Sequence, residues 1–517
     1  MVTSNYFVKV DWDNAGTYVG TYDDISSDVL NVTFKRGRNY ASQLTGNSTA
    51  GVLTATLNNT SGKYSPSNGS SVLTGKLTPG RRVQLSINSG SFPYTFPFIF
   101  SEAPMWTGRL SAIMPTPAST ALHTATLTAE GVLGYLNDFV PITEMQTSIR
   151  TDQAVGEVLD ALDWPSGDRD LATGQTTMVR WWTDSAKTID ALLTVEETEN
   201  GFIKETADGS VGFESRHTRL ASPYDTSNAT FSDASDATNT YTTLQQLDPL
   251  STVINTFRAK ARKYTVGSVA TLWTSPESGS DSPSLVTGES KTFIASYPNS
   301  NSDNNAIGVG TWTTPVASTD YVANTASDGS GTNKTSDITV TQTKVANEMI
   351  MTFANGSTDT VYLTTLQARG TSLSESNNVT VSASSATSIT KYGERKFVAK
   401  SGFFPSSSEA QSWANYQLQM HGTPVDILTM SFSANVSSAN MTQALEREIS
   451  DRITVVANTN AVLGISADFF IEAIAHNITQ GGTKHDVTYQ LSPVNEGYTQ
   501  FWILGTGVLG TSTVPAY

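Results

Sequence analysis

Residues 180–220 read RWWTDSAKTIDALLTVEETENGFIKETADGSVGFESRHTRL, and this stretch decides the fold that we predict. Four apolar residues recur in it at helical spacing and form one stripe: Ala186, Ile189, Leu192 and Leu193. Asp184 or Ser185 stands where a side chain can accept hydrogen bonds from the first free N–H groups of a helix. Asn200-Gly201 predicts the end of this helix, because glycine takes the left-handed conformation at little cost.

A tight hairpin is predicted directly after the helix. Phe202 opens one strand and Phe213 lies on its partner. Asp208-Gly209 between them suits a type I′ turn, which needs positive φ at both central positions. We expect the apolar stripe of the helix to pack on this hairpin as a small α/β unit. The sequence on both sides has the pattern of β-structure, so the unit is predicted to join two larger β-domains.

The composition favours a large β-rich protein. The chain has 517 residues, more than one hydrophobic core normally serves. Only 38% of the residues are hydrophobic and 15% are charged, which suits β-structure with uncharged polar surfaces. The formal net charge of −16 excludes the basic footprint of a nucleic-acid-binding protein. An acidic wall still suits a conduit for DNA, because like charge prevents the polymer from sticking.

Several classes of site are excluded by what the sequence lacks. With 0 cysteines it has no disulfide framework, no thiolate nucleophile and no zinc-thiolate site. No apolar run approaches the roughly 20 residues that span a bilayer, so no membrane-spanning segment is expected. The N-terminus also lacks the basic and apolar regions of a signal peptide.

Two loops only partly match known binding motifs. Residues 69–77, GSSVLTGKL, are similar to a phosphate-binding loop, but the glycines are one residue too far apart. Residues 11–16, DWDNAG, open like a calcium loop, but Tyr22 stands where the bidentate glutamate belongs. We therefore interpret both as ordinary loops beside strands.

The histidines and the acidic run give no catalytic site either. His476 and His485 flank one predicted hairpin, but no carboxylate accompanies them as a third metal ligand, so we interpret the pair as structural. Glu196-Glu197-Thr198-Glu199 contains carboxylates that glycoside hydrolysis would need. Consecutive residues at a helix end point in different directions, so a solvated face is predicted instead. No catalytic residue, cofactor or metal site is expected.

A succession of short motifs near the N-terminus is more specific than the composition. The motifs are KRGR at 35–38, AGVLTATLNN at 50–59, GKYSP at 62–66, LTPGR at 77–81 and WTGR at 106–109. Together they resemble the N-terminal barrel of phage tail hub proteins, also called tail-tip or baseplate hub minor tail proteins.

Later segments extend this resemblance. Residues 199–216 are similar to the second, α/β domain of the family, and residues 446–493 look like the closing strands of its second barrel. The terminal segment 502–510 also looks like the end of such chains. The resemblance covers residues 1–265 and 390–517, whereas 266–389 departs from the compact hub pattern.

The predicted fold is mainly β with a small α/β unit. It comprises two similar antiparallel β-barrel domains, an α/β helix–hairpin domain and an inserted β-sandwich lobe. The expected boundaries are 1–144 for the first barrel, 145–240 for the helix–hairpin domain, 241–265 and 390–495 for the second barrel with a helix at 406–421, 266–389 for the lobe, and 496–517 for an apolar tail that docks on a neighbour.

The resemblance implies a structural role in the tip of a phage tail. Two barrels in each chain of a homotrimer would match a hexameric ring of the tail tube or distal tail protein, and the trimer would line or close the DNA channel. Implied partners also include the C-terminus of the tape measure protein and tail fibre or tip proteins, with genomic DNA as passing cargo. The implied location is the virion tail tip, assembled in the cytoplasm of the bacterial host.

Interface candidates follow from this role. Four arginines could donate to carboxylates of a partner ring, because guanidinium forks suit carboxylates: Arg36, Arg38, Arg81 and Arg82. They could equally be solvated charges at strand ends. In the tail, Trp502, Leu504 and Leu509 are the apolar candidates.

Two other classes of function remain open. A host-surface glycan-binding adhesin or receptor-binding tail protein would place its site in the 266–389 lobe. A cell-wall hydrolase would need an acid and a base, which no motif in the sequence supplies.

Overall fold

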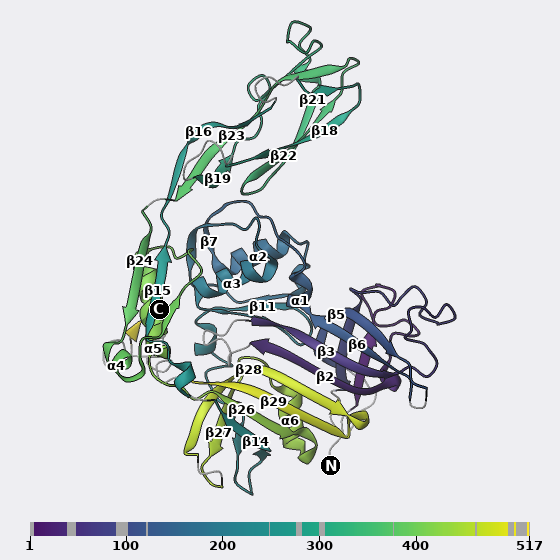
Figure 1. Cartoon of the computed structure of the whole chain (residues 1–517), viewed down its shortest axis with the longest axis vertical. Coiled ribbons are helices and arrows are strands. Elements are labelled where there is room, and N and C mark those ends of the chain that lie inside the picture. Colours follow the sequence, from purple (N-terminus) through teal and green to yellow (C-terminus); the bar gives the residue numbers. More distant parts are fainter. Residues whose placement is uncertain are drawn as a thin grey trace.

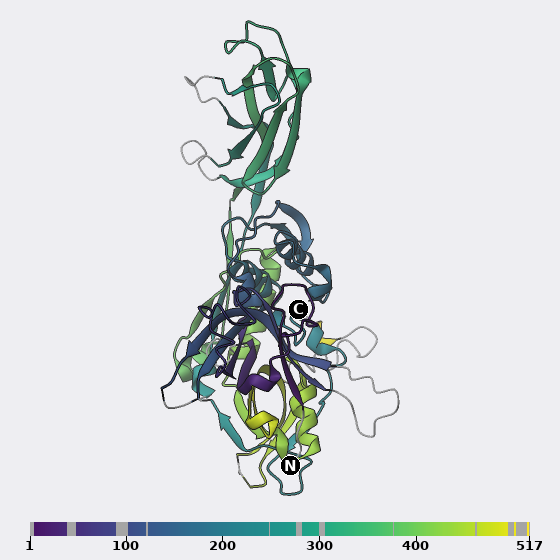
Figure 2. The ribbon, with the colours of Figure 1, turned by 90° about the vertical axis from the view of Figure 1, so that its right-hand side faces the viewer.

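The computed structural model describes residues 5–38, 48–88, 102–119, 122–247, 249–275, 282–298, 306–375, 377–460, 463–494, 501–502 and 514–515. Strands dominate these residues, as the sequence predicted. Two β-units lie side by side, a helix–hairpin unit lies next to them, and an elongated lobe extends beyond it (Figure 1). The perpendicular view shows that the lobe stands away from the rest of the chain (Figure 2).

The first β-unit is one antiparallel sheet in the order β1-β4-β5-β6-β3-β2. Its strands are β1 (Tyr6–Val10), β2 (Val29–Arg38), β3 (Ser48–Asn58), β4 (Arg82–Asn88), β5 (Glu102–Thr116) and β6 (Thr124–Gly131). Alternate residues of β6 are buried, which is the pattern of a sheet that covers a core on one face. That core includes Leu53, Val83 and Leu127.

The second β-unit is built around β28, with helix α6 packed against it. Its elements are β12 (Thr230–Ser232), β13 (Asn239–Thr240), β14 (Thr243–Gln246), β26 (Leu428–Ser433), β27 (Arg452–Ala457), β28 (Ile465–Thr479), β29 (Lys484–Pro493) and α6 (Ser438–Glu446). The predicted hairpin of β28 with β29 is confirmed. β26 pairs with β29, and β27 pairs with β28. Residues 230–246 supply three strands of this unit, β12, β13 and β14.

The two β-units share one sheet. β2 pairs antiparallel with β28 from Asn31↔Thr479 to Gly37↔Ala473, so the described strands of both units form a 13-stranded sheet. β1 and β2, at the two ends of the first unit, do not pair with each other in the described part of the chain. The predicted closed barrels are therefore not found among the described strands.

The helix–hairpin unit contains the elements predicted from residues 180–220. Helix α3 (Thr188–Glu199) runs into β10 (Phe202–Glu205) and β11 (Val211–Glu214). The helix begins after Lys187 without a side-chain cap, so the caps predicted at Asp184 or Ser185 are wrong. Asn200, with φ of 58°, takes the left-handed conformation that we expected of Gly201. Gly201 is needed for a different reason, because the backbone of β11 passes close to it. A Cβ on Gly201 would lie 2.3 Å from the carbonyl oxygen of Glu214.

The other elements of this unit surround α3. They are α1 (Val132–Leu136), β7 (Gln146–Arg150), α2 (Thr151–Asp160), β8 (Arg169–Leu171) and β9 (Thr177–Trp181). Leu192 and Val195 of α3 pack with Val155 of α2 and Phe213 of β11 in one core. The predicted packing of the helix on the hairpin is therefore confirmed.

Two strands lead from the second β-unit to the lobe. β15 (Thr256–Ala261) pairs with β24 (Val379–Ser384), and both pack against α5 (Ser407–His421) with β25 (Lys396–Val398) and α4 (Ala386–Tyr392) nearby. Helix α5 begins as predicted, because Ser406 Oγ accepts a hydrogen bond of 3.1 Å from the N–H of Glu409.

The lobe consists of two sheets around one core. One sheet contains β16 (Tyr264–Thr274), β17 (Ser284–Leu285), β19 (Ala306–Trp312), β20 (Tyr321–Asn324) and the long β23 (Val361–Glu375). The other contains β18 (Ser290–Ser296), β21 (Ile338–Lys344) and β22 (Glu348–Asn355). Val309 and Leu363 of the first sheet pack with Met351 and Phe353 of the second.

Candidate functional site at the junction of the β-units

The KRGR motif of β2 lies at the junction of the two β-units. Arg36 donates to both carboxylate oxygens of Glu448, at 2.5 and 2.7 Å. Arg38 donates to Glu472 of β28 at 2.8 Å, and both side chains are only 1% exposed. A Cβ on Gly37 would lie 2.4 Å from the Glu472 carbonyl oxygen, so glycine is required where β2 passes β28. Both arginines thus join the first β-unit to the second within one chain.

Glu472 lies at the centre of a buried ionic cluster. Besides Arg38, it accepts hydrogen bonds from Arg219 Nη1 and from Ser492 Oγ, each at 2.6 Å. Burial alone would raise the pKa of Glu472, but Arg219 and Arg38 lower this pKa to about 2. The carboxylate is therefore ionised at neutral pH and balances two guanidinium groups.

The helix–hairpin unit also takes part in this cluster. The ring of Phe202 in β10 lies between Arg38 and Arg219, whose guanidinium carbons are 3.7 and 4.1 Å from its centroid. Glu214 of β11 accepts from Lys204 at 2.5 Å and from Ser450 Oγ at 2.6 Å. Three units of the chain thus meet around one set of buried charges.

The acidic run of α3 lies at the same junction, and the prediction of a solvated face was wrong. Glu196 accepts from the N–H of Ile203 at 3.1 Å and from Ser48 Oγ at 3.2 Å. Glu197 accepts from the N–H of Lys400 at 3.2 Å. Glu199 accepts from the Thr176 N–H and from Thr151 Oγ1, each at 2.8 Å. Three glutamates at one helix end therefore point to three different segments.

Glu205 at the end of β10 reaches into the first β-unit. It accepts hydrogen bonds from the N–H groups of Gly51 and Leu133, both at 2.8 Å. A Cβ on Gly131 would lie 2.2 Å from its Oε2 atom, so only glycine fits there. Burial raises the pKa of Glu205 to about 7, and burial likewise raises that of Glu196 to about 7.

The two histidines of the predicted hairpin are in contact. His476 Nδ1 and His485 Nε2 are 2.7 Å apart, and His485 Nδ1 is 2.7 Å from the hydroxyl of Tyr6 in β1. Phe34 of β2 stacks on His476 with centroids 4.4 Å apart. Burial lowers the pKa of His485 to about 4, so this histidine is neutral at neutral pH. Within the described residues, no group of three His, Cys, Asp or Glu side chains could hold a metal ion.

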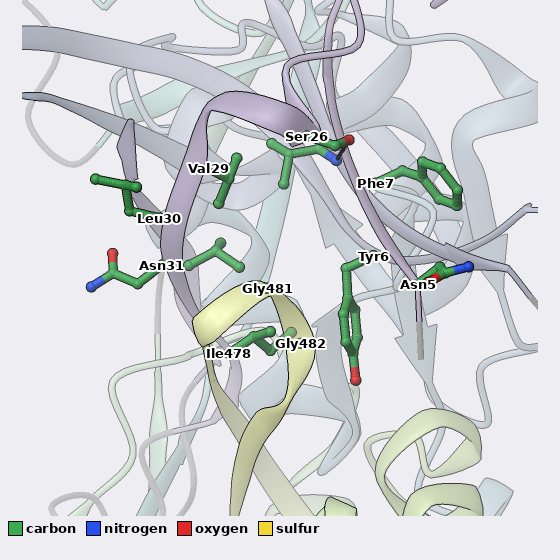
Figure 3. A pocket seen from close by; sticks show the side chains of 12 residues that line it. Asn5, Tyr6, Phe7, Ser26, Val29, Leu30, Asn31, Ile478, Gly481 and Gly482 are labelled. Atoms are coloured by element: carbon green, nitrogen blue, oxygen red, sulfur yellow. Dashed lines mark hydrogen bonds between the residues drawn. The ribbon is translucent and has the colours of Figure 1, made fainter. Parts of the chain in front are cut away.

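A cavity lies where the first β-unit fails to close, and we name it the seam pocket. Its volume is about 280 Å³. Tyr6 of β1 and Val29 of β2 lie on opposite sides of it, next to the Gly481-Gly482 turn between β28 and β29 (Figure 3). The remaining lining residues are Asn5, Phe7, Val8, Ser26, Leu30, Asn31, Val32 and Ile478.

The other interface candidates lie elsewhere. Arg82 pairs with Asp168 at 2.9 Å, and Arg81 donates to Thr78 Oγ1 at 3.1 Å; both arginines are partly exposed. Trp502 belongs to β30 (Phe501–Trp502), which pairs with β31 (Val514–Pro515). Leu504 and Leu509 lie outside the described residues. A role between subunits stays a prediction for all of these residues.

The sequence motifs identified part of this junction. KRGR was singled out as a compact basic element, and the histidine pair was placed on one hairpin. The partners of the arginines were missed, because Glu448 and Glu472 lie 412 and 434 residues away along the chain. The one available signal for Glu472 was a lone carboxylate inside the apolar run FFIEAIA at 469–475.

Comparison with known proteins gives structural matches alone. No family model matches the chain, and no curated protein sequence matches it. The 43 kDa tail protein of prophage MuSo2 from Shewanella oneidensis aligns over 95% of this chain and 98% of its own, with 8% identity and a TM-score of 0.48. The tail protein from Neisseria meningitidis MC58 aligns over 95% and 97%, with 9% identity and a TM-score of 0.48.

A third match is the prophage tail protein gp18 from Listeria monocytogenes EGD-e, over 95% of this chain and 96% of its own, with 9% identity and a TM-score of 0.41. All three are tail proteins, the class that the sequence of this chain resembles. None of the helices in the described part of the chain is both long and apolar enough to cross a membrane.

Proposed function

We propose that this chain is a structural component of a phage tail: a homotrimeric tail-tip or baseplate hub. The observation that carries the proposal is the pair of β-units joined by the antiparallel pairing of β2 with β28. The buried pair of Arg38 with Glu472 and the partly exposed pair of Arg36 with Glu448 support one register between these units. One chain therefore offers two adjacent β-units as a single body, and three chains around an axis would offer six.

Such a trimer would adapt a sixfold ring of the tail tube or distal tail protein to a threefold tip, and it would line or close the DNA channel. The excess of 47 acidic over 31 basic residues supports passage of DNA without adhesion to the wall. The proposed partners on the other side are tail fibre or tip proteins, and the C-terminus of the tape measure protein would enter from the tube. The chain would act in the virion tail tip, after assembly in the host cytoplasm, and it would not act as an enzyme.

The mass of the purified full chain in solution tests this proposal. Light scattering across a concentration series should give three times the chain mass of 55.3 kDa. A mass of one chain at every concentration, including in the presence of the distal tail ring, would contradict it.

A second candidate function is binding of host-surface glycans by the lobe. One observation favours it: Thr292, Thr352 and Thr341 stand in one row across β18, β22 and β21. The hydroxyls of Thr292 and Thr352 are 2.9 Å apart on a sheet face that stands away from the rest of the chain. Binding of the full chain to host polysaccharide, lost in Thr352→Lys and kept in Thr265→Lys on the other sheet, would support this function.

A further inference from the structure

The turn between β21 and β22 lies against the helix–hairpin unit, at the end of the lobe nearest to β7 (Figure 1). We propose that this contact is a latch. When it is closed it holds the lobe in one orientation, and when it opens the lobe swings on its connecting strands. The inference concerns a single chain and does not depend on the proposed trimer. It also gives a role to Asp184, which the sequence singled out but which does not cap α3.

The hairpin turn that forms the latch is buried. Ala346-Asn347 is a two-residue turn, because the residues that flank it exchange backbone hydrogen bonds of 2.9 and 3.4 Å. Turns of this kind usually face solvent, but Ala346 is only 1% exposed. Its N–H donates to the carbonyl oxygen of Thr143 at 2.9 Å, and its own carbonyl accepts from the N–H of Val309 at 3.3 Å. The turn is thus held between β19 and the helix–hairpin unit.

Asp184 holds the second residue of the turn. The side-chain amide of Asn347 donates to Asp184 Oδ2, while Ser185 Oγ donates to Asp184 Oδ1 at 3.0 Å. A Cβ on Gly308 would lie 2.4 Å from Asn347 Oδ1, so a glycine in β19 leaves room for this side chain. A hydrogen bond to a carboxylate is stronger than one between neutral groups, so Asp184 is the main acceptor of the latch.

The surface that receives the turn is fixed within the helix–hairpin unit. The N–H of Thr143 donates to the carbonyl oxygen of Thr183 at 2.9 Å, and the N–H of Thr183 donates to Thr143 Oγ1 at 3.0 Å. Both threonines are buried, with exposures of 4% and 6%. Since Asp184 directly follows Thr183, both acceptors of the latch belong to one hydrogen-bonded pair of segments.

The contact is not closely packed. A cavity of about 180 Å³ remains beside it, with Met145 on one side and Trp312 on the other. Side chains around a cavity lose part of their packing contacts. The latch therefore relies on hydrogen bonds, whose net contribution is small because water replaces each partner on opening.

The connecting strands supply the point about which the lobe would turn. β15 ends at Ala261 and β16 begins at Tyr264. The ring of Tyr264 lies edge-on against Trp182, with centroids 6.1 Å apart. This contact lies at the base of the lobe, so it can persist as a pivot while the latch opens.

Hydrogen exchange measured by mass spectrometry tests the latch, because the Ala346 amide loses its acceptor when the latch opens. In Asp184→Ala we expect the peptide that contains Ala346 to exchange about tenfold faster, since one charge-assisted hydrogen bond is lost. Asp170→Ala is the matched control, because Asp170 is an exposed aspartate of the same unit, and it should leave this rate unchanged. Peptides of β18 and of the C-terminal half of β22 should keep their rates in both variants.

A covalent lock tests the latch in the opposite direction. The natural chain has 0 cysteines, so Asp184→Cys with Asn347→Cys can be bridged within one chain by a short bis-maleimide. Electron microscopy of the bridged chain should show the lobe in one orientation, whereas the same double variant without the reagent should show several.

The outcomes separate this inference from the proposed hub. Unchanged exchange at Ala346 in Asp184→Ala, failure of the two cysteines to bridge, or lobes that vary as much after bridging as before would each overturn the latch and leave the hub intact. Faster exchange throughout the lobe would also overturn it, because the lobe would then unfold rather than swing. A chain that is monomeric in light scattering would instead contradict the hub and leave the latch intact.

Discussion

The junction of the β-units and the connection to the lobe are held together in contrasting ways. At the junction, strand pairing from Asn31 to Gly37 is accompanied by a buried carboxylate with two buried guanidinium groups. At the lobe, the pairing of β15 with β24 ends at Ala261, and a separate pairing of β16 with β23 begins at Tyr264, beside the partly exposed pair of Lys260 and Glu375. Buried charges fix a geometry because each depends on its partner, whereas exposed pairs contribute little. This difference predicts a rigid double β-unit and a hinge where the lobe is attached.

Among the variants considered, Glu472→Ala should lower the free energy of unfolding the most. It leaves Arg38 and Arg219 buried without their carboxylate, and loss of one partner of a buried pair costs about 3–5 kcal/mol. Hydrogen exchange of the β2 and β28 amides should accelerate correspondingly, while amides of the lobe keep their rates. Unchanged exchange at β2 would mean that strand pairing alone fixes the junction.

The next largest change in stability is expected when the pH is varied, because a buried carboxyl group at the same junction titrates. Burial raises the pKa of Glu205 from 4.5 to about 7, with Arg36 and Glu130 as its charged neighbours. Since the folded pKa lies above the unfolded one, the stability from the protonated form is complete below pH 4.5 and is lost as the pH rises to 7. This loss is on the order of 3 kcal/mol. Glu205→Gln should remove about half of the decline in stability between pH 4.5 and 7, because Glu196 has the same raised pKa of about 7 and keeps its share.

Glu472 serves as a control for that titration, because its contribution to stability changes with pH in the opposite direction. Its folded pKa of about 2 lies below the ordinary 4.5, so its contribution is present above pH 4.5 and is lost as the pH falls toward 2. The Glu205→Gln variant should therefore keep the acid-induced loss of the parent chain. A decline between pH 4.5 and 7 that is undiminished in Glu205→Gln would assign all of it to other groups, with Glu196 as the first candidate.

Phe202→Leu should lower the free energy of unfolding by an intermediate amount. It removes the aromatic face between two guanidinium groups at 3.7 and 4.1 Å, and we expect a loss of about 1–2 kcal/mol in unfolding free energy. Tyr392→Leu is the matched control, because Lys391 lies 5.0 Å from its ring and is exposed. Chemical denaturation followed by tryptophan fluorescence measures both variants. Equal effects would argue against a special role for the buried stack.

Glu375→Gln, at the connection to the lobe, should change the free energy of unfolding the least. Lys260 lies 2.9 Å and Arg262 3.8 Å from Glu375, but they are 43% and 31% exposed, so each pair contributes about 0.5 kcal/mol or less. Hydrogen exchange in β15 and β24 should therefore change little. An effect as large as that of Glu472→Ala would remove the distinction between the two regions.

Sequence patterns that extend over a few residues predicted the helices and strands that those residues form. The mainly β fold, a helix predicted at 406–421 and found at Ser407–His421, and the hairpin of β28 with β29 were all predicted from periodicity and turn chemistry. The failures concern partners that are distant along the chain. Periodicity predicts that 427–434 and 452–457 are strands. Which strands pair with them depends on the arrangement of the folded sheet, which periodicity does not contain. The acidic run of α3 appeared solvated because its N–H donors come from separate segments.

The most direct test of the double β-unit as the building block of a ring is electron microscopy of the purified chain. Class averages along the symmetry axis should contain six β-units around a central opening, related by a threefold axis, with three lobes that vary in position. Averages that contain isolated chains alone, or a ring with a number of β-units other than six, would contradict this account.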